Sequence, residues 1–391
     1  MGDDPASSNG ERLIFVSAAE QSADLHGANL IRAAQAADPG VRFIGVAGPM
    51  MREAGCEAID DMTAHAAMAG GIIKVVPKAL SVLRNCKRCL HQKPIDLCLV
   101  IDSPTLNLPV AKHAKAAGVP VFYFIAPQVW AWAESRVKRV RARVDKMAVI
   151  LPFEEKFFRD YGLDADYVGH PLFDVLENRT IDQAKLDAIK DKGQPIVTIL
   201  PGSRTHVTQE VFPGQVEVAK AITERFPRAH FCVSVANDRT RPIIEGLLAG
   251  SGLSHSLHQN ENGEILSAAD LALVASGTST LETAYYHTPM IVMYNGSRLG
   301  YHLVARWLIS TKQLALINII AGREMVPEFM PYYRSTKPIA ETALNLLSDD
   351  KLRADMREDI AQTISPLIKT GAVKNAANVL LNTLNSYSVA R

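Results

Sequence analysis

The sequence predicts an α/β protein with two open domains, each built around a parallel sheet. Short apolar runs alternate with longer amphipathic segments, which is typical of βαβ units. The predicted strands are 13–17, 43–47, 97–101, 121–126 and 147–151 in the first half, and 196–200, 230–235, 271–275 and 290–294 in the second. Between the halves, residues 169–194 lack a strand pattern and end in a polar cluster suited to a linker.

This segment without a strand pattern predicts the boundary between the two domains. We expect a first Rossmann-like domain at 12–175, a linker at 176–194 and a second Rossmann-like domain at 195–345. Residues 346–391 have helical periodicity without a strand, and we expect C-terminal helices that can pack back on the first domain. Because open sheets bind ligands at the carboxyl ends of their strands, the active site should lie in a cleft between the two domains.

Length and composition agree with this organisation. At roughly 150 residues per domain, 391 residues correspond to two or three domains, and 48% hydrophobic with 21% charged residues is an ordinary globular mixture. With 42 Lys plus Arg against 41 Asp plus Glu, the formal net charge is +1. No overall field therefore attracts the protein to nucleic acid or to an anionic membrane, and any such attraction must be local.

The sequence predicts neither export nor a membrane span. Residues 1–12 have no basic start and no apolar run, and Ala6 stands where an N-myristoylation pattern needs Ser or Thr. The longest uncharged stretch, 116–133, is divided by Gly and Pro, which predicts a buried strand and a loop. Five cysteines without a secretory signal indicate a reducing cytosol. For Cys86 and Cys89 we expect a surface helix rather than a metal or redox site.

Two strand ends in the second half carry small, hydroxyl-bearing turns. Neither G-x-G-x-x-G after the first strand nor G-x-x-x-x-G-K-[ST] occurs, which disfavours nicotinamide chemistry and P-loop phosphoryl transfer. Instead, one turn contains Ser203 and Arg204, and the other Gly277, Thr278 and Ser279. Since N–H groups at a helix N-terminus bind phosphate, the two turns predict a nucleoside diphosphate site. For the first turn, a tight turn with a surface arginine remains the alternative.

Glu282 has two interpretations. It lies three residues after Ser279, as in a helix capping box, and we favour this interpretation. An acid beside two phosphate turns can also accept hydrogen bonds from ribose hydroxyl groups.

Acidic residues also follow two strands of the first half. Asp102 comes directly after the strand at 97–101, where a half-buried carboxylate can act as a general base. Alternatively, it begins a turn and caps a helix from Asn107. Three polar residues follow the first strand: Glu20, Ser22 and Asp24. Helix capping explains Ser22 or Asp24 but is not needed for Glu20.

Positive charge is concentrated locally. Residues 136–146 contain six basic residues and one acid, with valines at helical spacing that predict an inward apolar stripe and outward cations. Residues 68–88 mix apolar residues with Lys and Arg, which suits a membrane interface or an acyl-chain site; a buried helix pair is the alternative. Asp164 and Asp166 match an Asp-x-Asp metal motif, but without further hard ligands we expect a turn and no metal.

Several motifs follow one another along the chain: GVAGPMM with GCEA (45–58), PQVWAW (127–132), LPFE (151–154), VGHPL (168–172), LPGSR (200–204), ASGTSTLE (275–282), and Asn318 with AGREMVPEF (321–329). In this order they resemble the lipid-A-disaccharide synthase family of bacterial glycosyltransferases. The resemblance extends from about Leu13 to about Leu380. It implies a GT-B fold, with two Rossmann-like parallel-sheet domains facing across a cleft and a helical C-terminus.

The resemblance also implies a reaction. The family joins UDP-2,3-diacylglucosamine to 2,3-diacylglucosamine 1-phosphate (lipid X), forming a β-1,6-linked disaccharide 1-phosphate and UDP in lipid A biosynthesis. Inversion at the anomeric carbon implies a single displacement. We expect no metal or other cofactor. The enzyme is expected in the cytoplasm, attached peripherally to the anionic surface of the inner membrane, with no nucleic-acid partner.

By the same resemblance, the site residues fall into three groups. The catalytic group is Asp102, the candidate base, and Glu20. The UDP-binding group is Ser203, Arg204, Asn237, Gly277, Thr278, Ser279, Glu282 and Asn318. The acceptor- or lipid-binding group is Ser22, Met68, Ile72, Ile73, Val76 and Trp130.

Some residues depart from the family pattern. Ala19 and Ala23 replace two glycines, Lys74 replaces a glutamate, and Thr105 replaces an aspartate. These departures bear on the acceptor site more than on the nucleotide site. The alternatives are a diverged UDP-sugar transferase with another lipid acceptor, an enzyme like UDP-N-acetylglucosamine epimerase, and a nucleotide-binding regulator without turnover.

Overall fold

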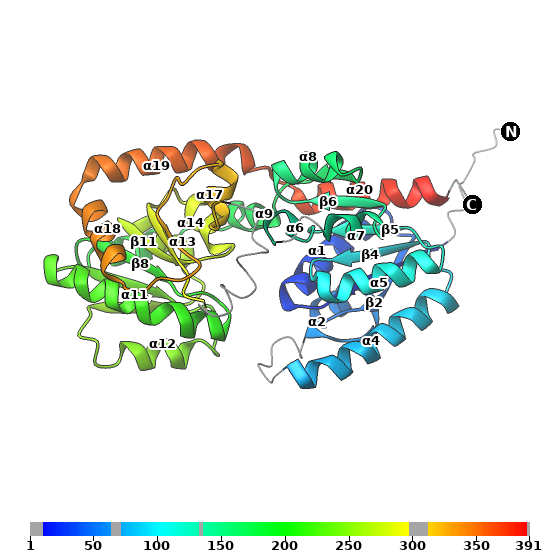
Figure 1. Cartoon of the computed structure of the whole chain (residues 1–391), viewed down its shortest axis with the longest axis horizontal. Helices are drawn as coiled ribbons and strands as arrows, with labels where there is room; N and C mark the ends of the chain where they lie inside the picture. The colour runs from blue at the N-terminus through cyan, green and yellow to red at the C-terminus, as the bar shows by residue number, and fades with distance from the viewer. Residues whose placement is uncertain (1–10, 64–71, 133–135, 297–311, 389–391) are drawn as a thin grey trace. The chain divides into compact units, whose positions relative to one another are not determined.

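A computed structural model describes residues 11–63, 72–132, 136–296 and 312–388. The chain divides into two compact units (Figure 1). Unit 1 comprises Met1–Asp174 and Lys369–Arg391, and unit 2 comprises Val175–Ile368. The segment 176–194, expected as a linker, falls in unit 2, where α10 (Gln183–Lys190) packs against α13 (Asn262–Ala268). Of the residues from 346 onward, only those from Lys369 belong to unit 1.

Unit 1 contains a seven-stranded parallel sheet with the order β3-β2-β1-β4-β5-β6-β7. Its strands are β1 (Arg12–Ala18), β2 (Val41–Val46), β3 (Cys56–Asp60), β4 (Leu97–Ile101), β5 (Val121–Phe124), β6 (Lys146–Val149) and β7 (Asp164–Tyr167). Its helices are α1 (Gln21–Ala37), α2 (Pro49–Glu53), α4 (Ile72–Gln92), α5 (Pro104–Ala116), α6 (Val129–Trp132), α7 (Val137–Arg141), α8 (Pro152–Asp160) and α20 (Ala372–Ser388). Helix α9 (Pro171–Glu177) spans the point of division.

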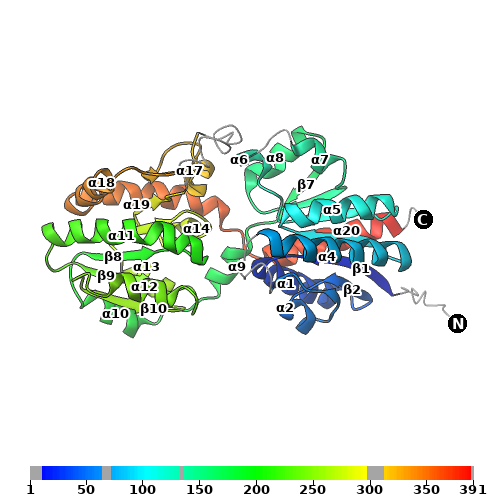
Figure 2. The ribbon, with the colours of Figure 1, turned by 60° about the horizontal axis from the view of Figure 1, so that its bottom comes forward.

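Helices cover both faces of the unit 1 sheet, which is why its central strands are apolar throughout. Buried residues of α4, α5, α7 and α8 form one core cluster with the sheet, and those of α1, α2 and α20 form the other. Helix α4 lies beside α5, and α20 lies beside α1 (Figure 2). The predicted valine stripe is confirmed, because Val137, Val140 and Val144 are buried while Lys138 and Arg139 are exposed.

The Cys-x-x-Cys pair lies in the core, so the expectation of a surface position was wrong for these side chains. Cys86 and Cys89 are on the buried face of α4, and both are free thiols. Burial raises the pKa of Cys86 to about 12. The pair therefore serves packing rather than redox or metal chemistry.

Unit 2 contains a six-stranded parallel sheet with the order β10-β9-β8-β11-β12-β13. Its strands are β8 (Ile196–Leu200), β9 (His230–Ser234), β10 (His255–His258), β11 (Leu271–Ala275), β12 (Met290–Met293) and β13 (Glu328–Phe329). Besides α10 and α13, its helices are α11 (Thr205–Arg225), α12 (Arg241–Leu248), α14 (Ser279–Tyr285), α17 (Leu316–Ala321), α18 (Lys337–Ser348) and α19 (Asp350–Ile364). Helix α11 packs against α12 and α18, and α14 packs against α17 and α19.

The strands missing from the sequence prediction are β3, β7, β10 and β13, which form the edges of the two sheets. Residues Asp164–Asp166 form part of β7, so the expected turn was wrong. The two carboxylates pair with Lys146 on β6 at 2.7 and 2.8 Å, and Asp166 also pairs with Arg159 at 3.0 Å. These ion pairs account for the Asp-x-Asp motif without a metal.

Candidate active site

The residues predicted to be functional follow four particular strands. The strand order reverses between β1 and β4 in unit 1 and between β8 and β11 in unit 2, and each of these pairs is hydrogen-bonded. Ligands of open α/β sheets bind outside the carboxyl ends of the strands at this reversal. Glu20 follows β1 and Asp102 follows β4, whereas Arg204 follows β8 and Gly277 follows β11. Within each unit, the fold therefore brings two predicted turns next to each other.

Asp102 lies in a strained turn. The φ angles are +50° at Asp102 and +43° at Ser103, a left-handed conformation that costs roughly 1–3 kcal/mol for each non-glycine residue. The buried Asn107 amide donates hydrogen bonds to the carbonyl oxygens of Ile101 and Asp102, both at 2.7 Å. The buried Tyr123 hydroxyl donates to the Asp102 carbonyl at 2.6 Å. Such conformations persist where neighbouring groups enforce them, and they cluster at functional sites.

Tyr123 is suited to holding this turn. Burial, together with the nearby charge of Asp102, raises the pKa of Tyr123 well above its ordinary value. The phenol therefore keeps its proton and remains a hydrogen-bond donor. Asp102 itself is half-buried at the end of β4.

The helix after Asp102 begins earlier than the capping interpretation requires. Helix α5 starts at Pro104, and Ser103 is its N-cap without a side-chain capping hydrogen bond. Asn107 lies inside α5, where its Oδ1 accepts a hydrogen bond from Ser17 Oγ at 2.7 Å. The interpretation of Asp102 as the cap of a helix from Asn107 was therefore wrong, because Pro at the first helical position sets the start.

The turn after β1 also differs from the capping interpretation. Glu20 is the N-cap of α1 but makes no side-chain capping hydrogen bond, and Ser22 lies within the first turn of the helix, exposed. Asp24 is fully buried, and its carboxylate accepts the N–H groups of Met50 at 3.0 Å and Met51 at 3.2 Å. It therefore caps α2 instead of α1, where a carboxylate is favoured by the helix dipole.

Trp130 lies in the core of unit 1 instead of on an acceptor surface. Its side chain is buried, and its indole N–H donates to Glu154 Oε1 at 2.9 Å. Glu154 is 1% exposed, and its Oε2 accepts the N–H groups of Ile150 and Leu151. Burial raises the pKa of Glu154 to about 7, although these hydrogen bonds lower it. Burial and this hydrogen bond give Trp130 a place inside unit 1, and its contact with acceptor or lipid stays a prediction.

The remaining lipid-contact predictions can be followed only along part of α4. Met68 lies outside the described residues, as do the side chains of Ile72, Ile73 and Val76. Further along α4, Leu80 is 55% exposed, and Arg84, Lys87 and Arg88 are exposed around it. This outward face combines an apolar side chain with cations. Among the residues that the structure describes, no helix is long and apolar enough to span a membrane.

In unit 2, the turn after β8 presents Ser203 and Arg204 at the start of α11. Both residues are exposed. The turn requires glycine at position 202, where φ is +99° and a methyl group would lie 2.8 Å from Val207 Cγ1. An exposed cation and a helix N-terminus are therefore presented together at the end of a buried strand.

Asn237 ties this turn to the neighbouring one after β9. Its Nδ2 donates to the Ser203 carbonyl oxygen at 2.9 Å, and its Oδ1 accepts the N–H groups of Arg239 and Thr240. The side chain thus fixes two loops relative to each other. Asn237 thus lies beside the Ser203 turn, and its contacts are within the protein; its binding of the nucleotide stays a prediction.

The turn after β11 is open. Gly277 has a φ of +146°, and a methyl group there would meet nothing within 4 Å in the described part of the chain. Glycine is therefore needed for the backbone conformation rather than for space. Thr278 is exposed at the N-cap of α14 without a capping hydrogen bond, and Ser279 Oγ donates to the Ala275 carbonyl at 2.9 Å.

Glu282 does not form the capping box that the sequence favoured. Its Oε1 accepts from Arg179 Nη1 at 2.9 Å, and its Oε2 accepts from Asn262 Nδ2 at 3.1 Å. Ser279, the predicted partner, points back to the strand. The carboxylate is thus held from both sides next to the open turn. Sequence reasoning missed Arg179 and Asn262, because Arg179 is 103 positions away and neither residue belongs to a recognisable motif.

Asn318 has a structural place instead of the expected nucleotide contact. It is fully buried, and its Nδ2 donates to the Val326 carbonyl and to Glu328 Oε2, both at 2.9 Å. Its Oδ1 accepts the N–H groups of Met325 and Val326. All four hydrogen-bonding positions of the amide are used, so the side chain organises its own loop.

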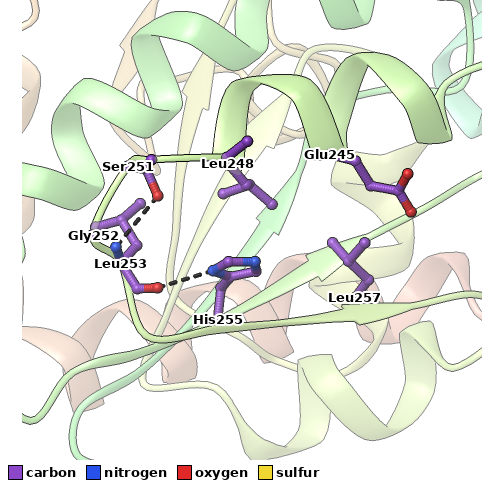
Figure 3. A pocket seen from close by; sticks show the side chains of 9 residues that line it. Glu245, Leu248, Ser251, Gly252, Leu253, His255 and Leu257 are labelled. Carbon is purple, nitrogen blue, oxygen red and sulfur yellow. Dashed lines mark hydrogen bonds between the residues drawn. The ribbon is translucent and has the colours of Figure 1, made fainter.

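A hollow of about 380 Å³ lies elsewhere in unit 2, between the end of α12 and the start of β10 (Figure 3). Two of its polar side chains are bonded within the loop: His255 Nδ1 bonds the Leu253 carbonyl, and Ser251 Oγ accepts the Leu253 N–H. It adjoins the amino end of a strand, whereas the predicted nucleotide turns follow carboxyl ends. We therefore assign no function to this hollow.

Known proteins are similar to this chain along nearly its whole length. A model of the family described as lipid-A-disaccharide synthetase matches residues 14–382. The lipid-A-disaccharide synthase of Syntrophus aciditrophicus is 36% identical over 375 residues, covering 95% of this chain and 97% of that protein.

Solved structures share the fold. A putative UDP-N-acetylglucosamine 2-epimerase from Listeria monocytogenes has a TM-score of 0.63 at 13% identity, covering 97% of this chain and 96% of that one. MurG of Acinetobacter baumannii has a TM-score of 0.58 at 13% identity, covering 95% and 99%. The two-domain GT-B architecture is confirmed, but at this identity the likeness does not distinguish an epimerase from a transferase. The match along nearly the whole sequence does, and the chain belongs to the lipid-A-disaccharide synthetase family of glycosyltransferases.

Proposed function

We propose that this protein transfers a 2,3-diacylglucosaminyl group from its UDP derivative to 2,3-diacylglucosamine 1-phosphate, giving the β-1,6-linked disaccharide 1-phosphate and UDP. One observation carries the proposal beyond family membership. A strained, hydrogen-bonded turn presents Asp102 at the strand reversal of unit 1, and two glycine turns, of which the one at Gly277 is open, occupy the strand reversal of unit 2. A base and an anion site are what this displacement needs.

In the proposed step, the acceptor 6-hydroxyl oxygen attacks the anomeric carbon of the donor. Asp102 takes the hydroxyl proton as the new carbon–oxygen bond forms, and the bond to the UDP oxygen breaks with its electron pair leaving on the diphosphate. Arg204 and the N–H groups at the Gly277 turn stabilise the negative charge that develops there. Glu282 accepts hydrogen bonds from the ribose. The protein supplies these charges itself, so the proposal includes no metal or other cofactor.

The departures from the family pattern are compatible with this acceptor. Ala23 is fully buried and Ala19 is 8% exposed, so their methyl groups pack into the core of unit 1. Thr105 is exposed in the first turn of α5. The side chain of Lys74 lies outside the described part.

The direct test is to incubate the purified protein with UDP-2,3-diacylglucosamine and 2,3-diacylglucosamine 1-phosphate and to analyse the products by mass spectrometry and NMR. We expect the β-1,6 disaccharide with release of one UDP per linkage. UDP binding without disaccharide would contradict the proposed acceptor and favour a diverged transferase. Conversion of UDP-N-acetylglucosamine to its 2-epimer would instead favour the epimerase-like alternative.

We also propose that the enzyme works in the cytoplasm, bound peripherally to the inner membrane through the outward face of α4. Leu80 and the cations around it suit an anionic lipid surface. Sedimentation with vesicles containing anionic lipid tests this proposal. The double variant Arg84→Glu, Lys87→Glu should lose vesicle binding, whereas the variant Lys351→Glu on α19 should not. Equal sedimentation of all three proteins would contradict the assignment.

A further inference from the structure

Glu282 is held by an interaction network that neither helix capping nor sheet packing requires. Its two carboxylate oxygens are held by different donors, Arg179 at 2.9 Å and Asn262 at 3.1 Å. The Glu282 side chain is only 13% exposed, and it lies one turn into α14 after the open Gly277 turn. A carboxylate oxygen accepts more than one hydrogen bond, so each oxygen retains capacity for a ligand hydroxyl group.

The orientation of Asn262 is itself determined. Ser234, at the end of β9, donates from Oγ to Asn262 Oδ1 at 2.7 Å. The amide N–H₂ lies toward Glu282, because a carboxylate only accepts hydrogen bonds, and this leaves the amide oxygen toward Ser234. One side of the carboxylate is therefore fixed through β9 and the start of α13.

Arg179 fixes the other side from a different part of the chain. Its side chain is 28% exposed, and although burial lowers the pKa of Arg179, Glu282 and, to a smaller extent, Tyr286 raise it overall. The arginine stem runs over Gly263, where a methyl group would lie 3.3 Å from Arg179 Cδ and 2.8 Å from Tyr286 Oη. Glycine at this position of α13 thus leaves room for the stem, and the close packing limits where the guanidinium can lie.

We propose that Arg179 is a positioning residue. It holds Glu282 so that the carboxylate receives the hydroxyl groups of a ribose ring, and it thereby sets the preference for a uridine ribonucleotide over its 2′-deoxy analogue. This inference rests on the proposed function, in which Glu282 faces the ribose. Arg179 acts through Glu282 and does not touch the reacting atoms.

The test compares the binding of UDP and 2′-deoxy-UDP by calorimetry. The wild-type protein should prefer UDP by roughly tenfold, because 2′-deoxy-UDP lacks the hydroxyl group that would donate a hydrogen bond to the charged Glu282 carboxylate. Arg179→Met should reduce this preference to roughly twofold. Arg179→Lys should give an intermediate value, because lysine keeps the charge but not the planar fork.

A double-mutant cycle with Glu282→Gln separates positioning from a purely structural contribution. If Arg179 acts through Glu282, Arg179→Met should change the preference no further in the Glu282→Gln background. In turnover assays, Arg179→Met should raise KM for the UDP-sugar with little change in kcat, because the ribose is remote from the reacting carbon. The control Lys185→Met removes another ion pair of unit 2, with Glu261, and should leave both nucleotides bound as in the wild type.

The outcomes are distinguishable. Wild-type protein that binds no UDP would contradict the proposed function and this inference with it. The positioning role alone would be overturned if Arg179→Met kept the wild-type preference for UDP over 2′-deoxy-UDP. It would also be overturned if this variant lost affinity for both nucleotides equally. If Arg179→Met does not fold, the same comparison is decided by Arg179→Lys, whose unchanged preference would count against the inference.

Discussion

The strand ends of unit 1 and those of unit 2 are built in different ways. In unit 1, buried polar side chains anchor the turns: Asn107 and Tyr123 hold Asp102 in a left-handed conformation, and Glu154 holds Trp130 and its own loop. In unit 2, the turns rely on glycine at positions 202 and 277 and are exposed, although Asn237 also holds the Ser203 carbonyl.

This difference matches the chemistry proposed for each unit. A general base must keep one atom within hydrogen-bond reach of a reacting hydroxyl, so a rigid anchor is useful. A diphosphate brings its own charge and several acceptor oxygens, so an open turn with N–H donors and a flexible cation is sufficient. The comparison predicts that changes in unit 1 act on turnover, whereas changes in unit 2 act on nucleotide affinity.

The largest effect is expected from Asp102→Asn. Asparagine has the same shape and tolerates the left-handed conformation, so the turn should survive while the base is lost. We expect kcat to fall by about 10²–10⁴-fold and the affinity for UDP to stay unchanged. Turnover within about twofold of the wild type would remove Asp102 from the mechanism. A parallel loss of UDP affinity would contradict the expectation that changes in unit 1 act on turnover alone.

The next largest effect should be a pH dependence of stability that arises in unit 1. Glu154 has a pKa of about 7 in the folded protein against an ordinary value of 4.5. As pH rises, Glu154 ionises in the unfolded chain before it ionises in the folded protein. Its contribution to the free energy of unfolding should therefore be fully present below pH 4.5 and be lost as pH rises to about 7, a decrease of at most about 3 kcal/mol. Glu154→Gln should be less stable overall, because its amide faces donors, but should lose this pH dependence.

Unfolding measured by denaturant at several pH values checks this slope. Glu155→Gln on the same helix is the matched control, because Glu155 is only half-buried and pairs with Arg159 near the surface. An identical slope in the wild type and Glu154→Gln would show that the buried carboxylate is not its source.

Arg204→Ala tests the open turn of unit 2. Loss of a charged hydrogen-bond donor should weaken UDP binding by roughly tenfold to a hundredfold, with the fold intact because the side chain is exposed. Arg225→Ala, in the last turn of the same helix, should bind UDP as the wild type does. A titration giving the same dissociation constant for Arg204→Ala would refute the assignment.

The smallest effect is expected from Tyr123→Phe, which removes only the hydroxyl bond to the Asp102 carbonyl. One neutral hydrogen bond contributes about 1 kcal/mol, so kcat should fall several-fold while UDP affinity is retained. Tyr387→Phe on α20, whose side chain is 37% exposed, is the control. If both variants have wild-type kcat, Asn107 alone suffices to hold the turn.

The sequence predicted the central strands well and the edge strands poorly, for one physical reason. Strands such as β4, β8 and β11 are buried on both faces, so they are continuous apolar runs whose bounds match the prediction. Edge strands such as β3 and β7 are partly exposed, and β7 contains two aspartates. Their pairing depends on partners such as Lys146, which sequence spacing does not reveal.

The same distinction applies to the site. Asp102 and Gly277 were predictable because each follows a central strand, and chain position alone places such residues at the carboxyl edge of a sheet. The partners of Trp130 and Asn318 within the protein were not predictable, because residue type does not show whether a polar atom is satisfied inside the protein or available to a ligand.

The amino-acid sequence by itself determined the two-sheet architecture, the family and the strand ends that carry the proposed base and phosphate turns, because local patterns of apolar and small residues encode them. Only the tertiary structure showed that Glu282 bonds with Arg179 and Asn262 instead of forming a helix capping box. Only the tertiary structure placed Arg179 beside that carboxylate. The partners are 103 positions apart, and the competition between a local helix cap and a distant guanidinium is decided by packing.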